Sequence, residues 1–493
     1  MTPPPKKTRT ALSESDQSTI RAAFLLLGSM AIASLVGCAS FSGIESTSIP
    51  MDVSTLGLKN LDFSMNTERS NTGSDWWLDF GDAQLNTLVS TALRISPSLK
   101  VTQARLTQAL SASAAVKAVG APQINGALDL THQLYSANNI YPPPIGGAVL
   151  DSGSLQATVI WEVDFFGKNR SALEASLGLI RASEADAHAA RSLLATNVAR
   201  SYFQLVRLQA HLKLAQRTLA QREHIQRLVR DRVNAGLDTQ LELQQADGAL
   251  PDARLQIELL NEQMALTVNA LAALTAQQVS ALHLELPALS MVGGERLVSS
   301  MPLDLLGRRS DIAAARWRVE AAVSDLAATK AQFYPNVNLV GFAGLSSIGF
   351  GKLLKSDSEQ WGAGPAIRLP LFEGGRLRAN LRGKTAELDA AIESYNAQVL
   401  QAVHEVADCI TSSQGVHRQQ FEQRIAQSSA ETSYSIALQR YEAGLGNYLK
   451  VLSAESPLLE QRRKGVDLAA RALDTQVQIL HAIGGAIVPT VPN

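Results

Sequence analysis

The chain has 493 residues but very little cysteine, few aromatic side chains and no excess of charge of either sign. Its two cysteines exclude a disulfide scaffold and a cysteine-rich metal site. A nucleic-acid-binding protein is also excluded, because 44 basic and 45 acidic side chains leave no basic surplus. Hydrophobic residues nevertheless make up 46% of the chain, which is far too much for a disordered protein.

Patterns typical of catalysis and ligand binding are missing as well. The eight histidines show no metal-ligand spacing, and neither a catalytic triad nor a phosphate-binding glycine loop is evident. We therefore expect no enzyme, no metal site and no cofactor apart from a covalent lipid. No run of about 18 apolar residues follows residue 38, so no transmembrane helix is expected in the mature chain.

The N-terminus has the pattern of an export signal. A polar segment with basic residues precedes an apolar run, which ends in Leu-Val-Gly at 35–37 and then Cys38. This ending resembles the lipobox of bacterial lipoproteins, which implies cleavage before Cys38 and a covalent lipid on its side chain. Ala39 follows, and the same resemblance favours the outer membrane. A plain secretory signal with a chance cysteine is the alternative. Cys409 is expected to be a small buried residue.

The chain contains one structural unit twice. Residues 98–122 align with 311–335 without a gap, and residues 232–243 resemble 440–451. Matched blocks in the same order indicate a tandem repeat, in which each copy contributes the same supersecondary unit. The predicted organisation is a signal peptide (1–37), a lipid-anchored extension (38–74), a first repeat (75–290), a second repeat (291–484) and a tail (485–493).

Each repeat contains two segments in which apolar and polar residues alternate. Such a period of two predicts strands with one face exposed to water. Each segment is about ten residues long, which is the length that a tilted membrane-spanning strand needs. Four strands are too few to close a barrel, so copies of the chain must share one; a dimer with eight strands and a trimer with twelve both fit. A soluble hairpin is the alternative. The predicted strands are 123–134, 154–164, 335–345 and 361–371.

Two long helical hairpins are expected at 167–274 and 374–483. Between Lys168 and about Asn234 there is no proline and only one glycine, and apolar residues recur at steps of four and three. This heptad pattern predicts a coiled coil of about 100 Å at 1.5 Å per residue. Arg222 and Gln226 interrupt its apolar seam. The sequence Ala-Gly-Leu stands at the end of each long helix, where glycine can adopt the left-handed conformation.

Three motifs carry a family resemblance. Residues 76–85 (WWLDFGDAQL), 302–312 (PLDLLGRRSDI) and 333–335 (FYP) resemble signatures of the outer-membrane factor family, of the TolC and OprM type that includes NodT-type efflux lipoproteins. The resemblance covers residues 75–484. Ser310 departs from the pattern, because the family favours proline at this position. We expect the helix that begins there to have a less rigidly held first turn.

The resemblance implies a fold that is mainly α with a transmembrane β-barrel part. Three copies would complete a twelve-stranded barrel, and their coiled-coil hairpins would form a periplasmic tunnel. The implied function is the exit duct of a tripartite efflux pump, which works with a periplasmic adaptor and an inner-membrane transporter, expected to be of the resistance-nodulation-division (RND) type. The alternatives are a duct for type I protein secretion and, less favoured, a periplasmic adaptor lipoprotein. The exported substrate is not encoded in the motifs.

The same resemblance places the functional residues at the periplasmic end of the hairpins. Glu242 and Tyr441 match a pair that holds the entrance shut in TolC-like members, and Leu449 matches an apolar constriction. The helix tips, which are expected to contact the adaptor, are formed by Gly236, Leu237, Gly444 and Leu445.

Two gate positions depart from the family pattern. Lys450 and Ser453 stand where relatives have aspartates, so an acidic ring at the gate is not expected. Glu242 and Lys450 occupy equivalent places in the two repeats. We hypothesise that they attract each other between neighbouring hairpins when the gate is closed. The alternative is two solvated side chains, because exposed ion pairs contribute only about 0–1 kcal/mol.

Overall fold

The computed structural model describes residues 41–51, 75–289 and 309–484. The expected signal peptide, Cys38, most of the extension and the C-terminal tail lie outside these residues. The chain divides into two compact units, one around the sheet and one purely helical. None of the described helices contains an apolar stretch long enough to cross a membrane.

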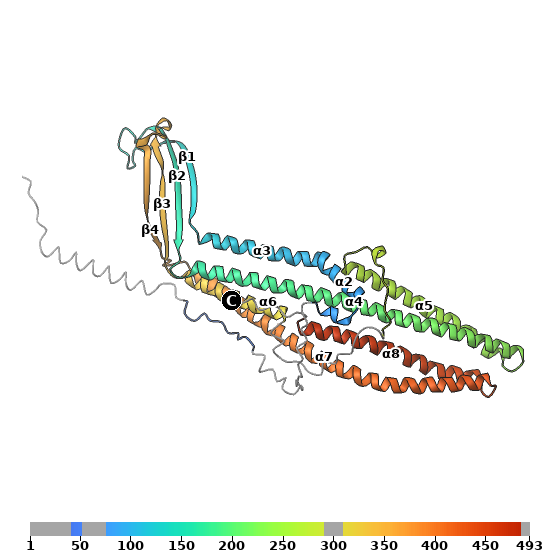
Figure 1. Cartoon of the computed structure of the whole chain (residues 1–493). Helices are drawn as coiled ribbons and strands as arrows, with labels where there is room; N and C mark the ends of the chain where they lie inside the picture. The colour runs from blue at the N-terminus through green and yellow to red at the C-terminus, as the bar shows by residue number, and fades with distance from the viewer. Residues whose placement is uncertain (1–40, 52–74, 290–308, 485–493) are drawn as a thin grey trace, which may run out of the picture. The chain divides into compact units, whose positions relative to one another are not determined.

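The first unit contains one antiparallel sheet of four strands in the order β1-β2-β3-β4 (Figure 1). The central pair, β2 and β3, joins the two repeats, with Leu155 opposite Leu345. The outer strands β1 and β4 each pair with one described strand only, so both edges of the sheet are open. The strands are β1 (Gln123–Leu134), β2 (Val149–Val163), β3 (Asn336–Ile348) and β4 (Glu359–Arg368).

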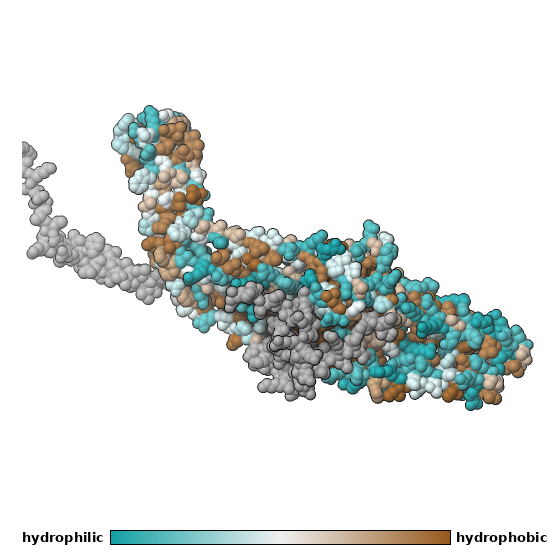
Figure 2. All heavy atoms as spheres, viewed as in Figure 1, coloured by the Kyte–Doolittle hydropathy of each residue, from teal (hydrophilic) through white to brown (hydrophobic). Residues whose placement is uncertain are grey.

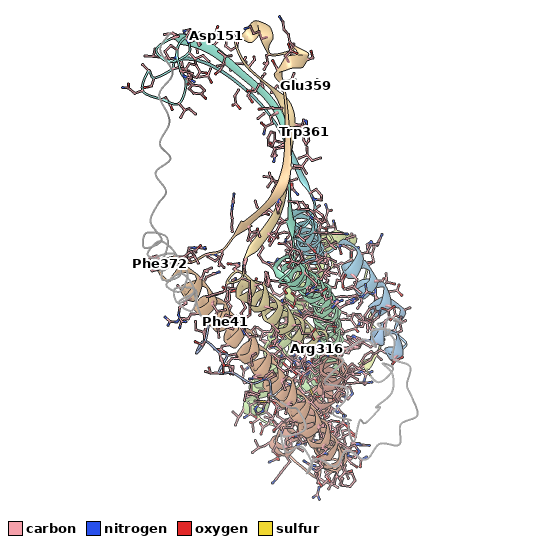
Figure 3. All side chains as sticks on the ribbon, turned by 90° about the vertical axis from the view of Figure 1, so that its left-hand side faces the viewer. Phe41, Asp151, Arg316, Glu359, Trp361 and Phe372 are labelled. Atoms are coloured by element: carbon pink, nitrogen blue, oxygen red, sulfur yellow. The ribbon has the colours of Figure 1, made fainter. Side chains whose placement is uncertain are left out.

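Several strand boundaries differ from the sequence prediction by one to five residues, and β3 runs to Ile348 instead of 345. β2 begins at Val149 instead of 154, because β1 continues to Leu134 and these two residues pair. β4 ends at Arg368 instead of 371, where Leu369 leads into Pro370, a residue that cannot donate to a strand ladder. Trp361 on β4 is 81% exposed (Figure 3), and Figure 2 shows hydrophobic residues among polar ones on the visible face of the sheet.

Corresponding hairpin helices in the two halves of the chain have the same length. The long helices α4 and α7 each have 67 residues, or about 100 Å of helix, and the return helices α5 and α8 each have 35. Equal lengths in both halves agree with a tandem repeat. The helices are α2 (Ala83–Ile95), α3 (Pro97–Val119), α4 (Lys168–Asn234), α5 (Gln240–Leu274), α6 (Ser310–Ala331), α7 (Arg376–Glu442) and α8 (Tyr448–Ala482).

The Trp-Trp motif lies in one of the buried apolar clusters of the helical unit. Trp76 and Trp77 are buried in a short 3-10 helix and pack with Phe203 of α4 in one apolar cluster. Asp82 caps α2 by accepting hydrogen bonds from the first backbone N–H groups of that helix. The same carboxylate accepts a hydrogen bond of 2.6 Å from the Tyr202 hydroxyl of α4. The motif therefore combines a buried aromatic core with a helix cap that is tied to α4.

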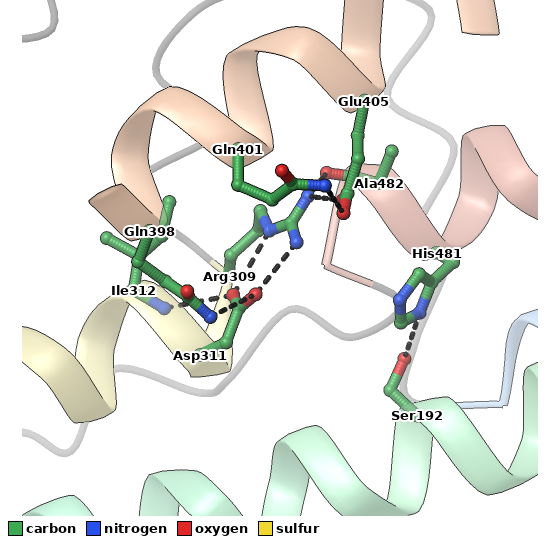
Figure 4. A network of polar contacts seen from close by, with 9 residues as sticks. All are labelled: Ser192, Arg309, Asp311, Ile312, Gln398, Gln401, Glu405, His481 and Ala482. Atoms are coloured by element: carbon green, nitrogen blue, oxygen red, sulfur yellow. Dashed lines mark hydrogen bonds and ion pairs between the residues drawn. The ribbon is translucent and has the colours of Figure 1, made fainter. Parts of the chain in front are cut away.

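The Arg-Arg motif fixes the start of α6 (Figure 4). The Arg309 side chain is only 5% exposed and lies 2.7 Å from Asp311 and 2.7 Å from Glu405 of α7. It also donates to the carbonyl of Ala482, at the end of α8. Cys409 lies in the adjoining apolar cluster, and burial raises the pKa of its thiol to about 11. One buried guanidinium thus joins three helices.

Candidate functional site: the paired hairpin tips

Both long helices end in the same glycine turn. Gly236 and Gly444 have φ of 73° and 74°, the left-handed conformation expected from the sequence. The N–H groups of Leu237 and Leu445 close these turns by donating to carbonyls of the last helical turn, at 2.9 and 2.8 Å. Their side chains are 66% and 69% exposed. Each tip therefore presents one leucine to solvent.

Asp238 joins the two tips. The Tyr441 hydroxyl, from the last turn of α7, donates a hydrogen bond of 2.5 Å to Oδ2 of Asp238, just before α5. Arg232, from the last turn of α4, donates from Nε to the same oxygen at 2.9 Å. The Arg232 guanidinium also lies over the Tyr441 ring, 4.7 Å from its centroid. We call these three residues the tip lock.

Burial and charge set the protonation states of the tip lock. Burial alone would raise the pKa of Asp238, but hydrogen bonds from Arg232 and Tyr441 outweigh it, so the pKa lies below its ordinary value. Burial and the neighbouring Asp238 carboxylate raise the pKa of Tyr441. At neutral pH a charged acceptor therefore faces a protonated donor. Such charge-assisted hydrogen bonds are shorter and stronger than neutral ones.

Within one chain Glu242 caps the start of α5, and its expected role in the gate stays a prediction. It forms a capping box with Thr239 at the start of α5: its carboxylate accepts from the Thr239 backbone N–H at 3.0 Å and from the Thr239 hydroxyl. Within one chain, Tyr441 therefore bonds to Asp238 and not to Glu242. The Thr-x-x-Glu spacing is a capping signature, so the sequence did contain a signal for this role.

The other expected gate residues lie on the first turns of α8. Leu449 is exposed, and the Ser453 hydroxyl donates to the carbonyl of Lys450 at 2.9 Å. Among the ion pairs of the described residues, none joins Glu242 to Lys450 within one chain. The hypothesis of a contact between hairpins of neighbouring copies stays a prediction.

The two polar interruptions of the heptad seam form a second set of contacts above the tips. Arg222 of α4 lies 3.2 Å from Glu455 of α8, and both side chains are largely buried. Arg222 also donates to the carbonyl of Ala249 at 3.1 Å. Gln226 donates to Asp247 of α5 at 2.7 Å. Buried polar groups in a helix seam thus have partners on both neighbouring helices, as burial requires.

An apolar cluster packs beside these two sets of polar contacts. Tyr441 and Tyr448 contact each other with ring centroids 6.2 Å apart. Cluster residues come from all four hairpin helices, so the hairpins pack together as one body near their tips. The buried members are Ile225, Val229, Ala246, Tyr434, Tyr441, Tyr448, Val451 and Leu458.

The arrangement is one of packing and locking, without a chemical centre. The described part of the chain holds no group of three or more side chains suited to binding a metal ion. The tip lock consists of a tyrosine, an aspartate and an arginine that bond to one another. Its contacts can hold two helical hairpins together, and their loss would let the hairpins separate.

Known proteins share this architecture. Residues 88–277 and 301–485 match the family model described as outer membrane efflux protein. The multidrug resistance outer membrane protein MdtQ of Escherichia coli O6:H1 is 31% identical over 84% of this chain and 88% of its own length. The fusaric acid resistance protein FusA of Burkholderia cepacia is 34% identical over 71% of this chain and 67% of its own length. The crystal structure of the outer membrane protein VceC from Vibrio cholerae superposes with a TM-score of 0.79 at 35% identity, covering 84% of this chain and 99% of VceC. The chain therefore belongs to the outer membrane efflux protein family.

Proposed function

We propose that this outer-membrane protein is the exit duct of a tripartite efflux pump and that its tip lock keeps the duct closed at rest. The family membership and the two paired hairpins support the duct. In this proposal the channel conducts passively. An inner-membrane transporter, of the RND type, and a periplasmic adaptor deliver the substrate, and the exposed Leu237 and Leu445 side chains form the adaptor contact.

Surfaces that one copy leaves open support a homotrimer as part of this proposal. Both edges of the sheet lack a partner strand among the described residues, and unpaired edges invite strand pairing. Exposed apolar residues recur on α5 at Leu255, Leu259 and Leu266, and on α7 at Phe421 and Ile425. Stripes at such helical spacing are typical of helix faces that pack against a partner. Three copies would share a closed sheet of twelve strands and would bury these stripes.

The lipid anchor belongs to the same proposal. The lipobox-like sequence ends at Cys38, outside the described residues. A lipid on this cysteine would hold the mature N-terminus at the membrane. Stable anchoring needs two acyl chains or a second membrane contact, and the sheet would provide that contact.

Gating is proposed to occur by separation of the hairpin tips, in the manner of an iris. The observation that carries this proposal is the hydrogen bond between Tyr441 and Asp238, because it links a residue of α7 to the turn between α4 and α5. Loss of this bond would weaken the attachment of the two hairpins at their ends and favour their separation. Leu449, Lys450 and Ser453 lie on the adjoining turns of α8 and would line the constriction.

Tyr441→Phe tests the function and the gate together. The variant and the wild type are expressed with a matching adaptor and transporter in a strain that lacks its own exit ducts. We expect both to restore drug efflux, and only the variant to admit a large hydrophilic antibiotic. Tyr395→Phe, on the same helix, is the matched control and should stay tight. Failure of the wild type to restore efflux would contradict the duct, and a tight Tyr441→Phe variant would contradict the gate.

A further inference from the structure

The segment that follows the expected lipid site is attached to the helices of the first unit. Ile44 is 7% exposed and packs among Leu326 of α6 and Leu377 and Leu381 of α7. A buried apolar side chain in a segment without helix or strand structure needs such a receiving surface, because its own backbone supplies none. Residues 41–49 therefore follow the surface of α6 and α7; we call them the N-terminal strap.

One carboxylate oxygen accepts three hydrogen bonds from the strap. Oδ1 of Asp389, on α7, accepts hydrogen bonds from the Ser46 hydroxyl at 2.6 Å, from the Thr47 N–H at 3.1 Å and from the Ser48 N–H at 3.2 Å. The bonds from Ser46 and from the backbone of Ser48 lower the pKa of Asp389, so the carboxylate is charged at neutral pH. Because two of the donors are backbone groups, the contact fixes the course of the chain itself.

The strap begins where the helices meet the sheet. The ring of Phe41 packs edge-on against Phe333, with centroids 5.8 Å apart, and lies 6.5 Å from the ring of Tyr334 (Figure 3). Both partners stand just before β3. Tyr334 in turn stacks on Phe166, just before α4, with centroids 4.9 Å apart. Phe41 thus joins an aromatic group at the helix–sheet junction.

Phe41 follows Cys38 by only three positions, with two residues between them. An extended chain spans at most about 3.6 Å per residue, so a group on the Cys38 backbone is tethered within about 11 Å of Phe41. A loose tether would let a lipid reach any part of the membrane around the protein. A tether this short restricts the lipid to the surroundings of the helix–sheet junction.

We infer that Asp389 is a positioning residue that clips the N-terminal strap to α7 and thereby sets where the lipid of Cys38 enters the membrane. The inference rests on the proposed lipid anchor for its purpose, but the clip itself rests on the contacts of the strap alone. It predicts that the strap stays docked whether or not the lipid is present, and that it is released when the Asp389 carboxylate is removed.

Hydrogen–deuterium exchange of the full-length protein tests the clip. We expect the amides of Thr47 and Ser48 to exchange about tenfold faster or more in Asp389→Ala, since each loses a bond to a charged acceptor. Asp389→Asn retains a carbonyl acceptor and should give an intermediate rate. Asp408→Ala removes an exposed carboxylate of the same helix and should leave the strap unchanged. Equal exchange in Asp389→Ala and wild type would overturn the clip, as would equal acceleration along all of α7.

A spin label at Glu45→Cys, an exposed position within the strap, in a Cys409→Ala background, tests the positioning of the anchor. The label should be immobilised in the wild-type strap and become mobile in Asp389→Ala, in membranes as well as in detergent. A label that is equally mobile in both would overturn the positioning role. Mass spectrometry of the N-terminus tests the lipid separately: an unmodified Cys38 would remove the proposed anchor, while the exchange experiment would still decide whether Asp389 holds the strap.

Discussion

The hydroxyl of Tyr441 and the carboxylate of Asp238 lie 2.5 Å apart and connect the end of α7 to the turn between α4 and α5. The two residues are separated by 203 positions in sequence. Their bond is one of few polar links between the hairpins at the tips, and Arg232 reinforces it from α4. A separating pair of hairpin tips must break this contact.

Asp238→Asn should shift the duct toward its open state. The variant keeps an acceptor for Tyr441 but loses the charge that Arg232 and Tyr441 face. Hydrogen bonds to charged groups contribute about 1.5–3 kcal/mol, so the ratio of open to closed channels should rise about 10- to 100-fold. Uptake of a large hydrophilic antibiotic measures the change. Asp231→Asn, an exposed carboxylate of the same helix end, should behave like the wild type; leakage in this control would point to a non-specific effect of charge.

The closed state should resist mild acid. The pKa of Asp238 is lower in the tip lock than in a separated tip, so the stabilisation is complete above the ordinary pKa of about 3.9 and is lost as the pH falls through the lowered value. We expect constant conductance between pH 8 and pH 5, and an increase only below about pH 4. The acid-induced increase should be absent in Asp238→Asn. A rise in conductance near pH 6 would show that a group other than Asp238 makes the closed state sensitive to pH.

Arg309→Ala should destabilise the helical unit. The substitution leaves Asp311 and Glu405 without their buried cation, and removing one partner of such a network costs about 3–5 kcal/mol. The midpoint of thermal unfolding, followed by circular dichroism in detergent, should fall by several degrees. Arg382→Ala removes an exposed arginine from α7 and should leave the midpoint unchanged. Equal midpoints for Arg309→Ala and wild type would mean that the network contributes little.

The proposed pair of Glu242 and Lys450 can be separated from the capping role of Glu242. Glu242→Gln keeps a side chain that can complete the capping box. If Glu242 acts only through this cap, the variant should admit no more antibiotic than the wild type. If the pair forms between neighbouring copies, Glu242→Lys should leak and the exchange of both charges, Glu242→Lys with Lys450→Glu, should restore the seal. A tight Glu242→Lys variant in the antibiotic-uptake assay would exclude the pair from gating.

The apolar stripe on α5 should be required for assembly. Leu255→Asp places a charge on the face that we assign to the contact between copies, and burying an unpaired charge there is strongly unfavourable. We expect loss of the heat-modifiable trimer band on gel electrophoresis, whereas Leu255→Met should keep it. A trimer band of wild-type intensity in Leu255→Asp would place the interface elsewhere.

Sequence patterns were sufficient for the fold. The predicted mainly helical chain with four strands, and its family resemblance, are confirmed by the elements and by the family match. The long, unbroken heptad pattern of apolar residues predicted α4 and α7, and the glycines after these helices predicted the turns. These patterns depend only on residues close in sequence, so they can be recognised without knowing how the helices pack.

Tertiary partners could not be predicted in the same way. Arg222 appeared only as a break in the apolar seam, because its partner Glu455 lies on a different hairpin, 233 positions away. Asp238 was missed because the register between α4 and α7 decides which carboxylate reaches Tyr441. Glu242 is four residues further along and is already engaged with Thr239. The difference between these two carboxylates is one turn of helix, which a repeat alignment does not resolve.

Single-channel conductance in planar bilayers tests the tip lock most directly. Wild-type channels should show small conductance, and the Tyr441→Phe and Asp238→Asn variants should each show a large one. Since both substitutions weaken the same bond, the double variant should conduct little more than either single variant. Wild type and double variant with the same small conductance would show that these two residues do not keep the hairpin tips closed.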